Sequence, residues 1–511
     1  MTGDDDQARV LQFLADRATH GGAAVTHHET HLSHVFLAGL RAWKLKKAVR
    51  LPFVDFSTLE ARRLACAAEL RVNRRTAPAL YLAAVQVTEG EAGLALGGDG
   101  RVLDWVVEMR RFPDGALFSE MAAAGTLTRA HLRDLADAIA ALHVGAPPVP
   151  SASVPQRLPR TAAVVAGEVV DLAVGRGEAV SAAAAAWAEA IMAAMAPLGP
   201  RLDARARRGA VREGHGDLHF GNVCLFDGRA MPFDAIEFDP ALSVIDLLYD
   251  LAFPIMDLAA SGLEEEAPLF LGRYLSATRD YGAIDVIAPM ASLRAGVRAL
   301  VALSRPGAAQ TARALEHFAL AERLLRPPPP PRLIAVGGRS GSGKSTLAAS
   351  LAPDLAPPPW TVVLRSDEIR KRLAGVAPED RLPPEAYTQA ASDRVYRRLL
   401  RDAARALAAG ASVVVDAAFL KTSERADAAD VAARAGLGFD GFWLDAEDDV
   451  LAARIAAREA APAADASDAT AAVMRAQRAE PLAVPGWRSL DAAGTPDDVS
   501  RAARASLAEP D

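Results

Sequence analysis

Apolar and polar positions alternate in two different ways along the chain. In residues 332–511, short apolar runs are separated by long stretches rich in Ala, Arg and Leu. The short runs predict strands at 332–336, 361–366, 412–417 and 439–446, and a helix is expected from Thr346 onward. Such alternation is typical of a parallel sheet with helices on both faces, in which ligands bind beyond the carboxyl ends of the strands.

The N-terminal part of the chain follows a different pattern. Strand-like runs surround one helical stretch at 58–73, and from Leu117 onward the periodicity is almost wholly helical. A loop-and-strand region at 214–238 is the exception. We therefore expect a mixed strand-and-helix lobe over about residues 1–110 and a larger helical lobe over about 111–326, arranged around a cleft.

A run of consecutive prolines at 327–331 separates the two patterns. Prolines in series cannot continue a helix and favour an extended, semi-rigid conformation. The sequence therefore predicts a multidomain protein, with an α+β domain over 1–326, a linker at 327–331 and an α/β domain over 332–511.

The strand at 332–336 leads directly into the segment GGRSGSGKST, residues 337–346. Gly338, Gly343, Lys344 and Ser345 satisfy the pattern of a phosphate-binding loop, in which glycines let successive backbone N–H groups point at phosphate oxygens. The residues expected to bind ATP are Gly338, Ser340, Gly341, Ser342, Gly343, Lys344, Ser345 and Thr346. Lys344 is expected to reach the β- and γ-phosphates, and the Ser345 hydroxyl to ligate Mg²⁺.

Polar residues also follow the next two strands. Asp367 comes just after the second strand, and Arg370 lies one helical turn later on the same side. An Asp at this place can deprotonate an acceptor hydroxyl, and an Arg can hold an anionic group, although a helix-capping Asp and a surface Arg are equally compatible with the residues. Asp416 ends the third strand and is expected to orient Mg²⁺.

Arg454 and Arg458 are spaced i, i+4 on a predicted helix, next to an Ala-, Pro- and Asp-rich stretch. They are expected either to belong to a lid over the phosphates or to be surface arginines. With its phosphate loop and SDEIR motif, this half resembles small-molecule and polynucleotide kinases, including gluconate-kinase-like and zeta-toxin-like proteins. An N-K-x-D guanine motif is absent from the sequence, which favours ATP over GTP.

A second candidate site lies in HGDLHFGN, residues 215–222. Its polar residues have the H-x-D-L-x-x-x-N spacing of a protein-kinase catalytic loop, in which the Asp accepts a hydroxyl proton and the Asn binds Mg²⁺. These are Asp217 and Asn222. Acidic residues follow on the next strand-like segment, at Asp234, Glu237 and Asp239.

This part of the chain resembles the aminoglycoside phosphotransferase-like kinases, which have a bilobal protein-kinase-like fold. The resemblance implies catalytic roles for His215 and Asp217, and metal binding by Asn222 and Asp234, with Glu237 as a competitor. It further implies an ATP-gripping lysine, for which Lys44, Lys46 and Lys47 are the candidates, with Lys44 and Lys46 on one face of the strand. The partner of this lysine is expected to be Glu60 or Glu69 on the helix, and the adenine contact to lie near Glu108 and Met109. The segment 245–253 is similar to the family's structural aspartate helix. A G-x-G-x-x-G loop before the lysine strand is missing, and the metal strand has DAI in place of D-F-G.

Composition narrows the classes of function. Of the 511 residues 51% are hydrophobic, which is enough to form hydrophobic cores. Two cysteines favour a reducing compartment, and the formal net charge of −7 argues against general affinity for nucleic acids or anionic membranes. The N-terminus lacks the features of a signal peptide, and the Ala-rich stretch at 181–198 contains a glutamate, so we expect a cytoplasmic protein without a membrane span. A histidine cluster at 27–34 and an Arg-rich run at 201–212 are interpreted as a polar loop and a solvated helix face.

The whole chain resembles bacterial proteins that fuse a phosphotransferase-like domain to a P-loop kinase domain of the AAA type. The resulting hypothesis is an ATP- and Mg²⁺-dependent phosphotransferase with two kinase-type domains and a small-molecule hydroxyl acceptor. Three alternatives stay open: a degenerate regulatory N-terminal module, a polynucleotide 5′-end kinase, and a P-loop switch without an acceptor. Neither the acceptor nor the oligomeric state follows from the sequence.

Overall fold

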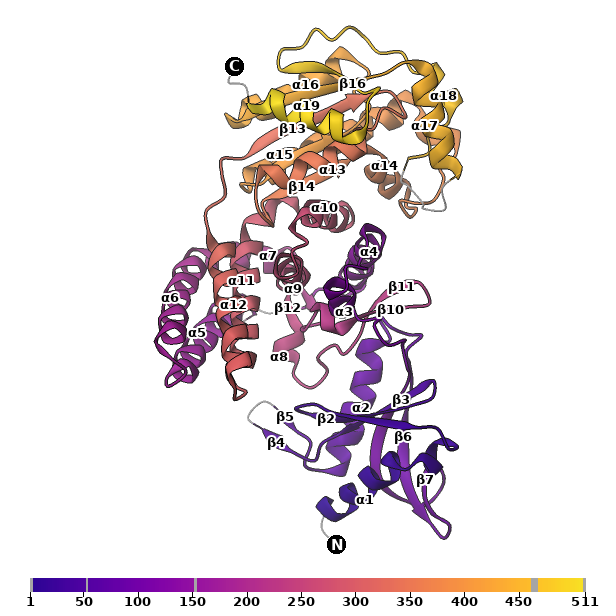
Figure 1. The fold of residues 1–511 in the computed structure, drawn as a ribbon, viewed down its shortest axis with the longest axis vertical. Helices are drawn as coiled ribbons and strands as arrows, with labels where there is room; N and C mark the ends of the chain where they lie inside the picture. The colour runs from indigo at the N-terminus through magenta and orange to yellow at the C-terminus, as the bar shows by residue number, and fades with distance from the viewer. Residues whose placement is uncertain (1–2, 52–53, 151–153, 461–466, 509–511) are drawn as a thin grey trace. The chain divides into compact units, whose positions relative to one another are not determined.

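The computed structural model describes residues 3–51, 54–150, 154–460 and 467–508 (Figure 1). The chain forms two compact units. Unit 1 comprises residues 1–158 and 199–254, and unit 2 comprises residues 159–198 and 255–511. Each unit is a mixed assembly of helices and strands, and only unit 2 contains a parallel sheet among the residues that the structure describes.

Unit 1 is built on a six-stranded antiparallel sheet with the order β1-β2-β3-β8-β6-β7. Its strands are β1 (Val25–Glu29), β2 (Ser33–Ala38), β3 (Arg41–Lys46), β6 (Tyr81–Gly90), β7 (Gly93–Leu96) and β8 (Arg101–Arg110). Side chains alternate between the two faces of a strand. In β3 this places Trp43 and Leu45 on one face and Lys44 and Lys46 on the other.

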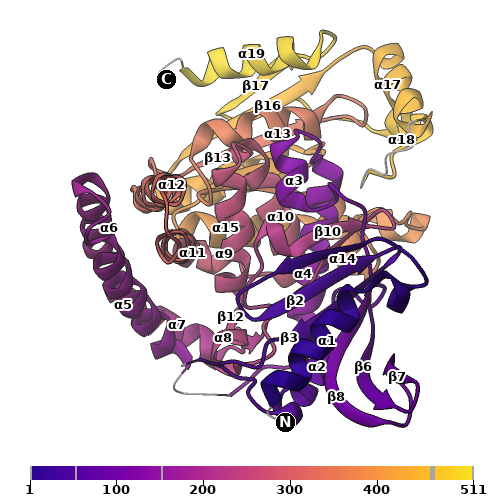
Figure 2. The same ribbon diagram turned by 60° about the horizontal axis from the view of Figure 1, so that its bottom comes forward.

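Two helices cover the two faces of this sheet (Figures 1 and 2). Helix α1 (Gly3–Ala15) packs Val10 and Leu14 into a core with Trp43 and Leu45. Helix α2 (Leu59–Asn73), which is N-capped by Thr58, packs Cys66 against the opposite face. The face that carries the two lysines is therefore the face that α2 covers.

The remainder of unit 1 is mainly helical, with short two-stranded sheets. Its strands include β4 (Arg50–Leu51), β5 (Val54–Asp55), β9 (Val211–Glu213), β10 (Val223–Phe226), β11 (Arg229–Pro232) and β12 (Val244–Asp246). Its helices include α3 (Phe118–Ala123), α4 (Arg129–Gly145), α7 (Gly199–Arg207), α8 (Pro240–Ser243) and the first part of α9 (Leu247–Ala260), since the unit ends at Pro254. The HGDLHFGN segment joins β9 to β10, and residues 233–239 join β11 to α8.

Unit 2 contains a five-stranded, wholly parallel sheet with the order β14-β15-β13-β16-β17. The strands are β13 (Arg332–Gly338), β14 (Thr361–Arg365), β15 (Ser412–Asp416), β16 (Gly438–Asp445) and β17 (Trp487–Asp491). Most residues of the three central strands are buried, as expected for strands that are covered on both faces. The prediction of a parallel α/β sheet is thus confirmed, and the four expected strands agree with β13 to β16.

The helices of unit 2 follow the strands or precede the sheet. They are α5 (Val154–Ala173), α6 (Glu178–Met195), α10 (Ala267–Thr278), α11 (Ile287–Leu303), α12 (Ala308–Leu325), α13 (Lys344–Leu355), α14 (Ser366–Ala374), α15 (Gln389–Ala408), α16 (Thr422–Ala435), α17 (Asp448–Ala460), α18 (Ala471–Ala476) and α19 (Pro496–Ala508). Helix α10 lies against the edge strand β14 (Figure 1). A Cβ on Gly272 would lie 2.2 Å from the carbonyl oxygen of Val363, so only glycine permits this close approach.

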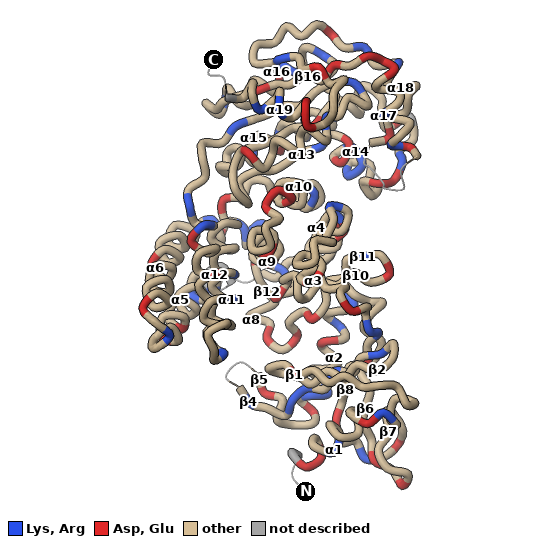
Figure 3. The backbone as a smooth tube through the Cα atoms, viewed as in Figure 1, with Lys and Arg blue, Asp and Glu red and all other residues tan. Residues whose placement is uncertain are grey.

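The compact units do not coincide with the boundary expected at 327–331. Because α10 packs directly on β14, residues 255–326 belong to the same compact unit as the parallel sheet, and the proline run lies inside that unit. Lys and Arg are interspersed with Asp and Glu along both units (Figure 3). Two helical segments, 178–207 and 281–303, are long and apolar enough to cross a membrane by length and composition, which is weak evidence because core helices meet the same criterion.

Candidate active sites

The phosphate-binding loop of unit 2 connects β13 to α13. Gly338 and Gly341 have φ angles of +143° and +83°, and a Cβ on either would lie 2.6 Å from a backbone carbonyl oxygen. Both positions therefore require glycine. The N-cap of α13, Gly343, provides no side-chain hydrogen bond, so the first N–H groups of the helix remain available to an anion.

Lys344, Ser345 and Asp416 lie together at the carboxyl ends of β13 and β15. The Ser345 hydroxyl donates to Asp416 Oδ2 over 2.6 Å, and Lys344 Nζ donates to the Arg339 carbonyl oxygen over 3.0 Å. Burial lowers the pKa of Lys344, and nearby Asp416 and Asp367 only partly oppose this shift. A hydroxyl and a carboxylate are oxygen ligands of the kind that Mg²⁺ takes together with phosphates and water, so these residues fit a Mg²⁺–nucleotide complex.

Asp367 and Arg370 begin helix α14, directly after β14. Burial raises the pKa of Asp367, and the negative charge of Asp416 adds to the effect. A carboxylate with a raised pKa is a better proton acceptor, as a general base requires. Arg370 instead faces the following loop: it donates to the Ala386 carbonyl oxygen over 2.8 Å, and its guanidinium lies 4.9 Å from the centre of the Tyr387 ring.

The structure separates the two arginines that were expected to form a lid. Arg454 donates to the carbonyl oxygens of Ala492, Ala493 and Gly494, over 2.7, 3.3 and 2.8 Å. Its guanidinium thus anchors the loop after β17, which favours the alternative of a surface arginine over a lid that binds phosphate. Arg458 donates to the Ala469 carbonyl oxygen and lies close enough to Lys344 to contribute to the lowering of its pKa.

Several residues around the phosphate loop were missed by sequence reasoning. Arg365, the last residue of β14, donates to Ser345 Oγ over 2.9 Å and to Asp416 Oδ2 over 3.2 Å. Gln477 Oε1 accepts from the Ser340 N–H over 2.8 Å. Asp468 accepts from the buried Lys371 over 2.7 Å and from Tyr387 over 2.6 Å, which joins α14 to the loop before α15. None of these residues belongs to the phosphate-loop pattern, and no spacing signal marks them.

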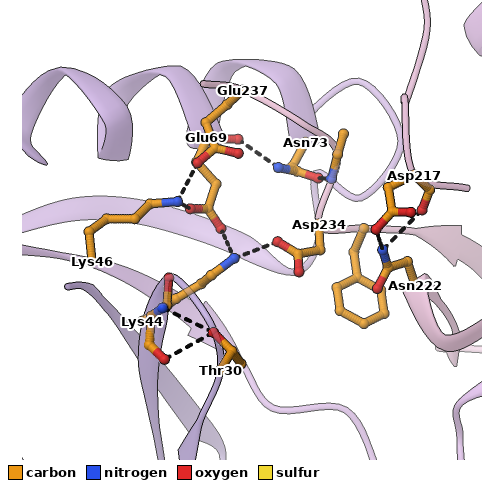
Figure 4. A network of polar contacts seen from close by, with 12 residues as sticks. Thr30, Lys44, Lys46, Glu69, Asn73, Asp217, Asn222, Asp234 and Glu237 are labelled. Carbon is orange, nitrogen blue, oxygen red and sulfur yellow. Dashed lines mark hydrogen bonds and ion pairs between the residues drawn. The ribbon is translucent and has the colours of Figure 1, made fainter. Parts of the chain in front are cut away.

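The candidate site of unit 1 begins with two buried lysines that share one carboxylate (Figure 4). Lys44 Nζ lies 2.9 Å from Glu69 Oε1, and Lys46 Nζ forms an ion pair with Glu69 Oε2. Burial raises the pKa of Glu69, but the charges of Lys44 and Lys46 outweigh it and bring the pKa to about 2. Of the two expected partners Glu69 is thus the one in contact, whereas Glu60 is exposed and pairs with Arg63.

Asp234 and Glu237 face the two lysines but differ in exposure. Asp234 forms an ion pair with Lys44 while its side chain is 42% exposed, and Glu237 pairs with Lys46 at 4% exposure. Glu237 is enclosed by its lysine, and burial raises its pKa. Asp234 has the left-handed φ angle of +61°, and its N–H donates to the Tyr81 hydroxyl over 3.1 Å. Access therefore favours Asp234 over Glu237 as a metal ligand.

Asp217 and Asn222 meet across the short loop between β9 and β10 (Figure 4). Asn222 Nδ2 donates to the Asp217 carbonyl oxygen over 3.0 Å and to its carboxylate over 3.1 Å. His219 Nε2 lies 3.5 Å from the same carboxylate. The Asp217 side chain is 40% exposed, so a hydroxyl-bearing molecule can reach it.

A buried aspartate on α9 accepts hydrogen bonds from the backbone at the start of this loop. Asp250 accepts from the N–H groups of His215 and Gly216 over 2.6 and 3.0 Å, and His143 Nε2 lies 3.2 Å from it. Burial opposes ionisation of Asp250, yet the histidines and these donors bring its pKa to about 2. His215 is fully buried, with Nε2 3.0 Å from the Phe233 carbonyl oxygen, which favours a positioning role over the expected catalytic role.

The expected adenine contact falls at the end of β8. Glu108 lies 3.5 Å from Arg41, and Met109 is buried in the core beneath α2. Asn73, which sequence reasoning did not single out, ends α2 and accepts from the Ala235 N–H over 2.8 Å. Asn73 and Tyr81 thus fix the backbone on both sides of the Asp234 peptide. Among the described residues, no group of three or more His, Cys, Asp and Glu side chains is placed to hold a metal ion.

The whole chain has relatives of similar length. Over 474 residues it is 31% identical to the "Uncharacterized protein Rv2004c" of Mycobacterium tuberculosis (strain ATCC 25618 / H37Rv), with 88% of this chain and 90% of the relative covered. The "Uncharacterized protein Mb2027c" of Mycobacterium bovis (strain ATCC BAA-935 / AF2122/97) matches to the same extent. The chain belongs to the family of these mycobacterial proteins. Since the match covers 88% of the chain, it includes most of both units.

Two further comparisons concern parts of the chain. Residues 333–481 match a family described as "AAA domain", which includes the phosphate loop, Asp367 and Asp416. Solved structures with a similar fold include a gluconokinase from Sinorhizobium meliloti 1021 (22% identity, 35% of this chain and 92% of that chain, TM-score 0.25) and the APS kinase CysC of Mycobacterium tuberculosis in complex with AMPPNP and APS (22%, 36% and 100%, 0.26). A glucosamine kinase covers more of the chain (19%, 63% and 81%, 0.37). At these identities and TM-scores, the similarity identifies no substrate.

Proposed function

We propose that unit 2 is an ATP- and Mg²⁺-dependent phosphotransferase that transfers the γ-phosphoryl group to a hydroxyl group of a small molecule. The observation that carries this proposal is the convergence of three strand ends. β13 leads into the glycine loop and Lys344, β15 ends at Asp416 beside Ser345, and β14 leads to Asp367. A phosphate grip, two metal ligands and a candidate base therefore lie at one edge of the sheet.

The reaction is an in-line displacement. The acceptor hydroxyl oxygen forms a bond to the γ-phosphorus, the bond between this phosphorus and the β–γ bridging oxygen breaks, and ADP leaves with that oxygen. Asp367 accepts the hydroxyl proton. Lys344 and the N–H groups at the start of α13 hold the phosphates in position. Ser345 and Asp416 would hold Mg²⁺, which would neutralise negative charge on the phosphates.

Unit 1 supports a second site of the same class. Lys44 with Glu69 would hold the nucleotide phosphates, Asp217 would accept a hydroxyl proton, and Asn222 and Asp234 would bind Mg²⁺. The exposed carboxylates of Asp217 and Asp234 and the buried Lys44–Glu69 pair support this proposal. The fold of unit 1 is accordingly proposed to be protein-kinase-like, and both acceptors to be small molecules of the cytoplasm rather than nucleic acids or membranes.

Phosphorylation of a metabolite extract with labelled ATP tests the function of unit 2. Lys344→Met should abolish a labelled small-molecule product, because the cation on the phosphates is lost, and mass spectrometry then identifies that product. Arg434→Met is the matched control, since Arg434 is 77% exposed and pairs with Asp430 on α16. If every labelled product formed equally in the wild type and in Lys344→Met, the proposal for unit 2 would be contradicted.

The same assay separates the other candidate functions. Labelling of a 5′-hydroxyl oligonucleotide that requires Asp367 would identify an end kinase. ATP hydrolysis without any labelled acceptor would identify a switch. If Asp217→Ala protein still forms every product that the wild type forms, unit 1 would be assigned a regulatory role.

A further inference from the structure

The parallel sheet of unit 2 brings an arginine onto the two side chains that are proposed to hold Mg²⁺. β14 and β15 end in register, with Arg365 paired to Asp416. Side chains at paired positions of neighbouring strands project to the same face. Arg365 Nη2 donates to Ser345 Oγ over 2.9 Å, and its Nε donates to Asp416 Oδ2 over 3.2 Å. One guanidinium therefore engages both oxygen ligands at once.

The guanidinium is also held from its other side. Arg365 Nη1 lies 3.5 Å from Glu368 Oε1 on α14, and the Arg365 side chain is only 10% exposed. Glu368 is in turn 3.5 Å from Arg273 of α10, which forms a further ion pair of 2.7 Å with Glu379. Arg365 thus has a second carboxylate to remain with if it leaves Asp416.

A divalent cation and a guanidinium compete for the same oxygens. When Mg²⁺ binds Ser345 Oγ and Asp416, these oxygens are no longer free to accept from Arg365, and two positive charges in contact repel. The buried carboxylate of Asp416 needs a cation, because an unpaired buried charge is costly. The guanidinium of Arg365 meets this need in the structure.

We propose that Arg365 is a resident cation that occupies the Mg²⁺ position of the phosphate-loop site and is displaced toward Glu368 when Mg²⁺ arrives with the nucleotide. This inference rests on the proposed nucleotide binding by unit 2. Arg365 makes the site less dependent on the metal in two ways. It competes with Mg²⁺ for Asp416, and it supplies positive charge near the phosphates when Mg²⁺ is absent.

Calorimetric titration with ADP tests the inference without turnover. For the full-length chain, the ADP binding that Lys344→Met abolishes is measured in EDTA and in saturating Mg²⁺. The dissociation constant in EDTA divided by that in Mg²⁺ reports how strongly the metal assists binding at the phosphate loop. Arg365→Met should raise this ratio by about 5-fold or more, which is the lower end of typical coupling between sites. Arg398→Met is the matched control, because Arg398 is similarly buried and pairs with Asp402 on α15. Its ratio should equal that of the wild type.

The outcomes distinguish the two proposals. If the wild type binds ADP and Lys344→Met does not, nucleotide binding by the phosphate loop is supported. If Arg365→Met then has the wild-type ratio of dissociation constants, only the proposed role of Arg365 is overturned. Absence of ADP binding by the wild type overturns both. If Arg365→Met does not fold, Arg365→Gln, which is neutral but can still donate to Asp416, must show the same rise. Arg365→Lys retains the charge and should stay near the wild-type ratio.

Discussion

The two lysines proposed to grip phosphate, Lys44 in unit 1 and Lys344 in unit 2, lie in opposite electrostatic surroundings. Lys44 contacts the carboxylates of Glu69 and Asp234, which outweigh the effect of burial and raise its pKa well above the ordinary value. Lys344 donates to a backbone carbonyl, and burial lowers its pKa. An anion that reaches Lys344 displaces no ion pair of that lysine, whereas an anion at Lys44 must compete with the carboxylates of Glu69 and Asp234.

The two sites also differ in the groups that are proposed to bind the phosphates. Unit 2 uses backbone N–H groups of a glycine loop and a helix N-terminus, so its shape depends on positions that exclude any Cβ. The sequence has no G-x-G-x-x-G loop before β3, and the grip proposed for unit 1 consists of charged side chains. In both units a basic side chain forms an ion pair with the carboxylate that is proposed to bind the metal. Lys44 pairs with Asp234, and Arg365 pairs with Asp416. Unit 1 should therefore be the more sensitive site to single charge changes.

The largest effect is expected from Lys44→Met. If unit 1 transfers phosphate, removing the only lysine that contacts both Glu69 and Asp234 among the described residues should reduce formation of its product by about 100-fold or more. The measurement is the initial rate with labelled ATP and the product identified in the extract assay. Products that depend on Lys344 should be unaffected.

Lys47→Met is the control for this change. Lys47 lies three residues further along the same segment, but it pairs with Glu29, whose side chain is 61% exposed. Equal rates in Lys44→Met and Lys47→Met would mean that unit 1 has no charge-dependent phosphate grip. The comparison between the two units would then be one between an active site and a regulatory module.

A smaller effect is expected from Asp250→Asn, which tests whether the loop at 215–222 depends on a buried charge. The pKa of Asp250 is about 2, against an ordinary value of 3.8. This difference corresponds to about 2 kcal/mol of stability at neutral pH. Because the pKa is lowered on folding, the contribution is complete above the ordinary pKa and is lost as the pH falls toward about 2.

Urea denaturation at about pH 6 and about pH 3 measures this dependence. The wild type should exceed Asp250→Asn by about 2 kcal/mol at the higher pH and by roughly half of that at the lower pH. Asp114→Asn, a change at a side chain that is 83% exposed and pairs with Arg111, should have little effect at either pH. A difference that does not change with pH would show that the charge of Asp250 is not what holds His215 and Gly216.

The parts of both sites that depend on local sequence were predictable. The glycines, Lys344 and Ser345 share one loop, and Asp367 and Asp416 follow recognisable strands, so a parallel sheet was bound to bring them to one edge. In unit 1 the alternation of β3 correctly placed Lys44 and Lys46 on one face. It could not choose between Glu60 and Glu69, because both lie on α2 and only the packing of that helix decides which one is buried.

Contacts that depend on register or on distant loops were not predictable. Arg365 meets Asp416 because β14 and β15 end in register, and no spacing within either strand encodes that pairing. Asn73 and Asp250 act on loops more than thirty residues away in the chain. The compact unit formed by residues 255–326 and the sheet depends on the approach of Gly272 to β14, and a lone glycine in a helix carries no signal of its partner.

The smallest effects are expected at α17, where the sequence treats two arginines alike and the structure does not. Arg458→Met should raise the dissociation constant of ADP a few-fold, because a positive charge near Lys344 is lost. Arg454→Met should leave that constant unchanged and instead lower stability by about 1 kcal/mol, since the carbonyl groups of Ala492 and Gly494 lose their donor. Calorimetry with ADP and thermal denaturation separate the two effects. If Arg454→Met weakened ADP binding as much as Arg458→Met, the loop after β17 would have to belong to the nucleotide site. The nucleotide would then contact more of the backbone than the phosphate loop alone.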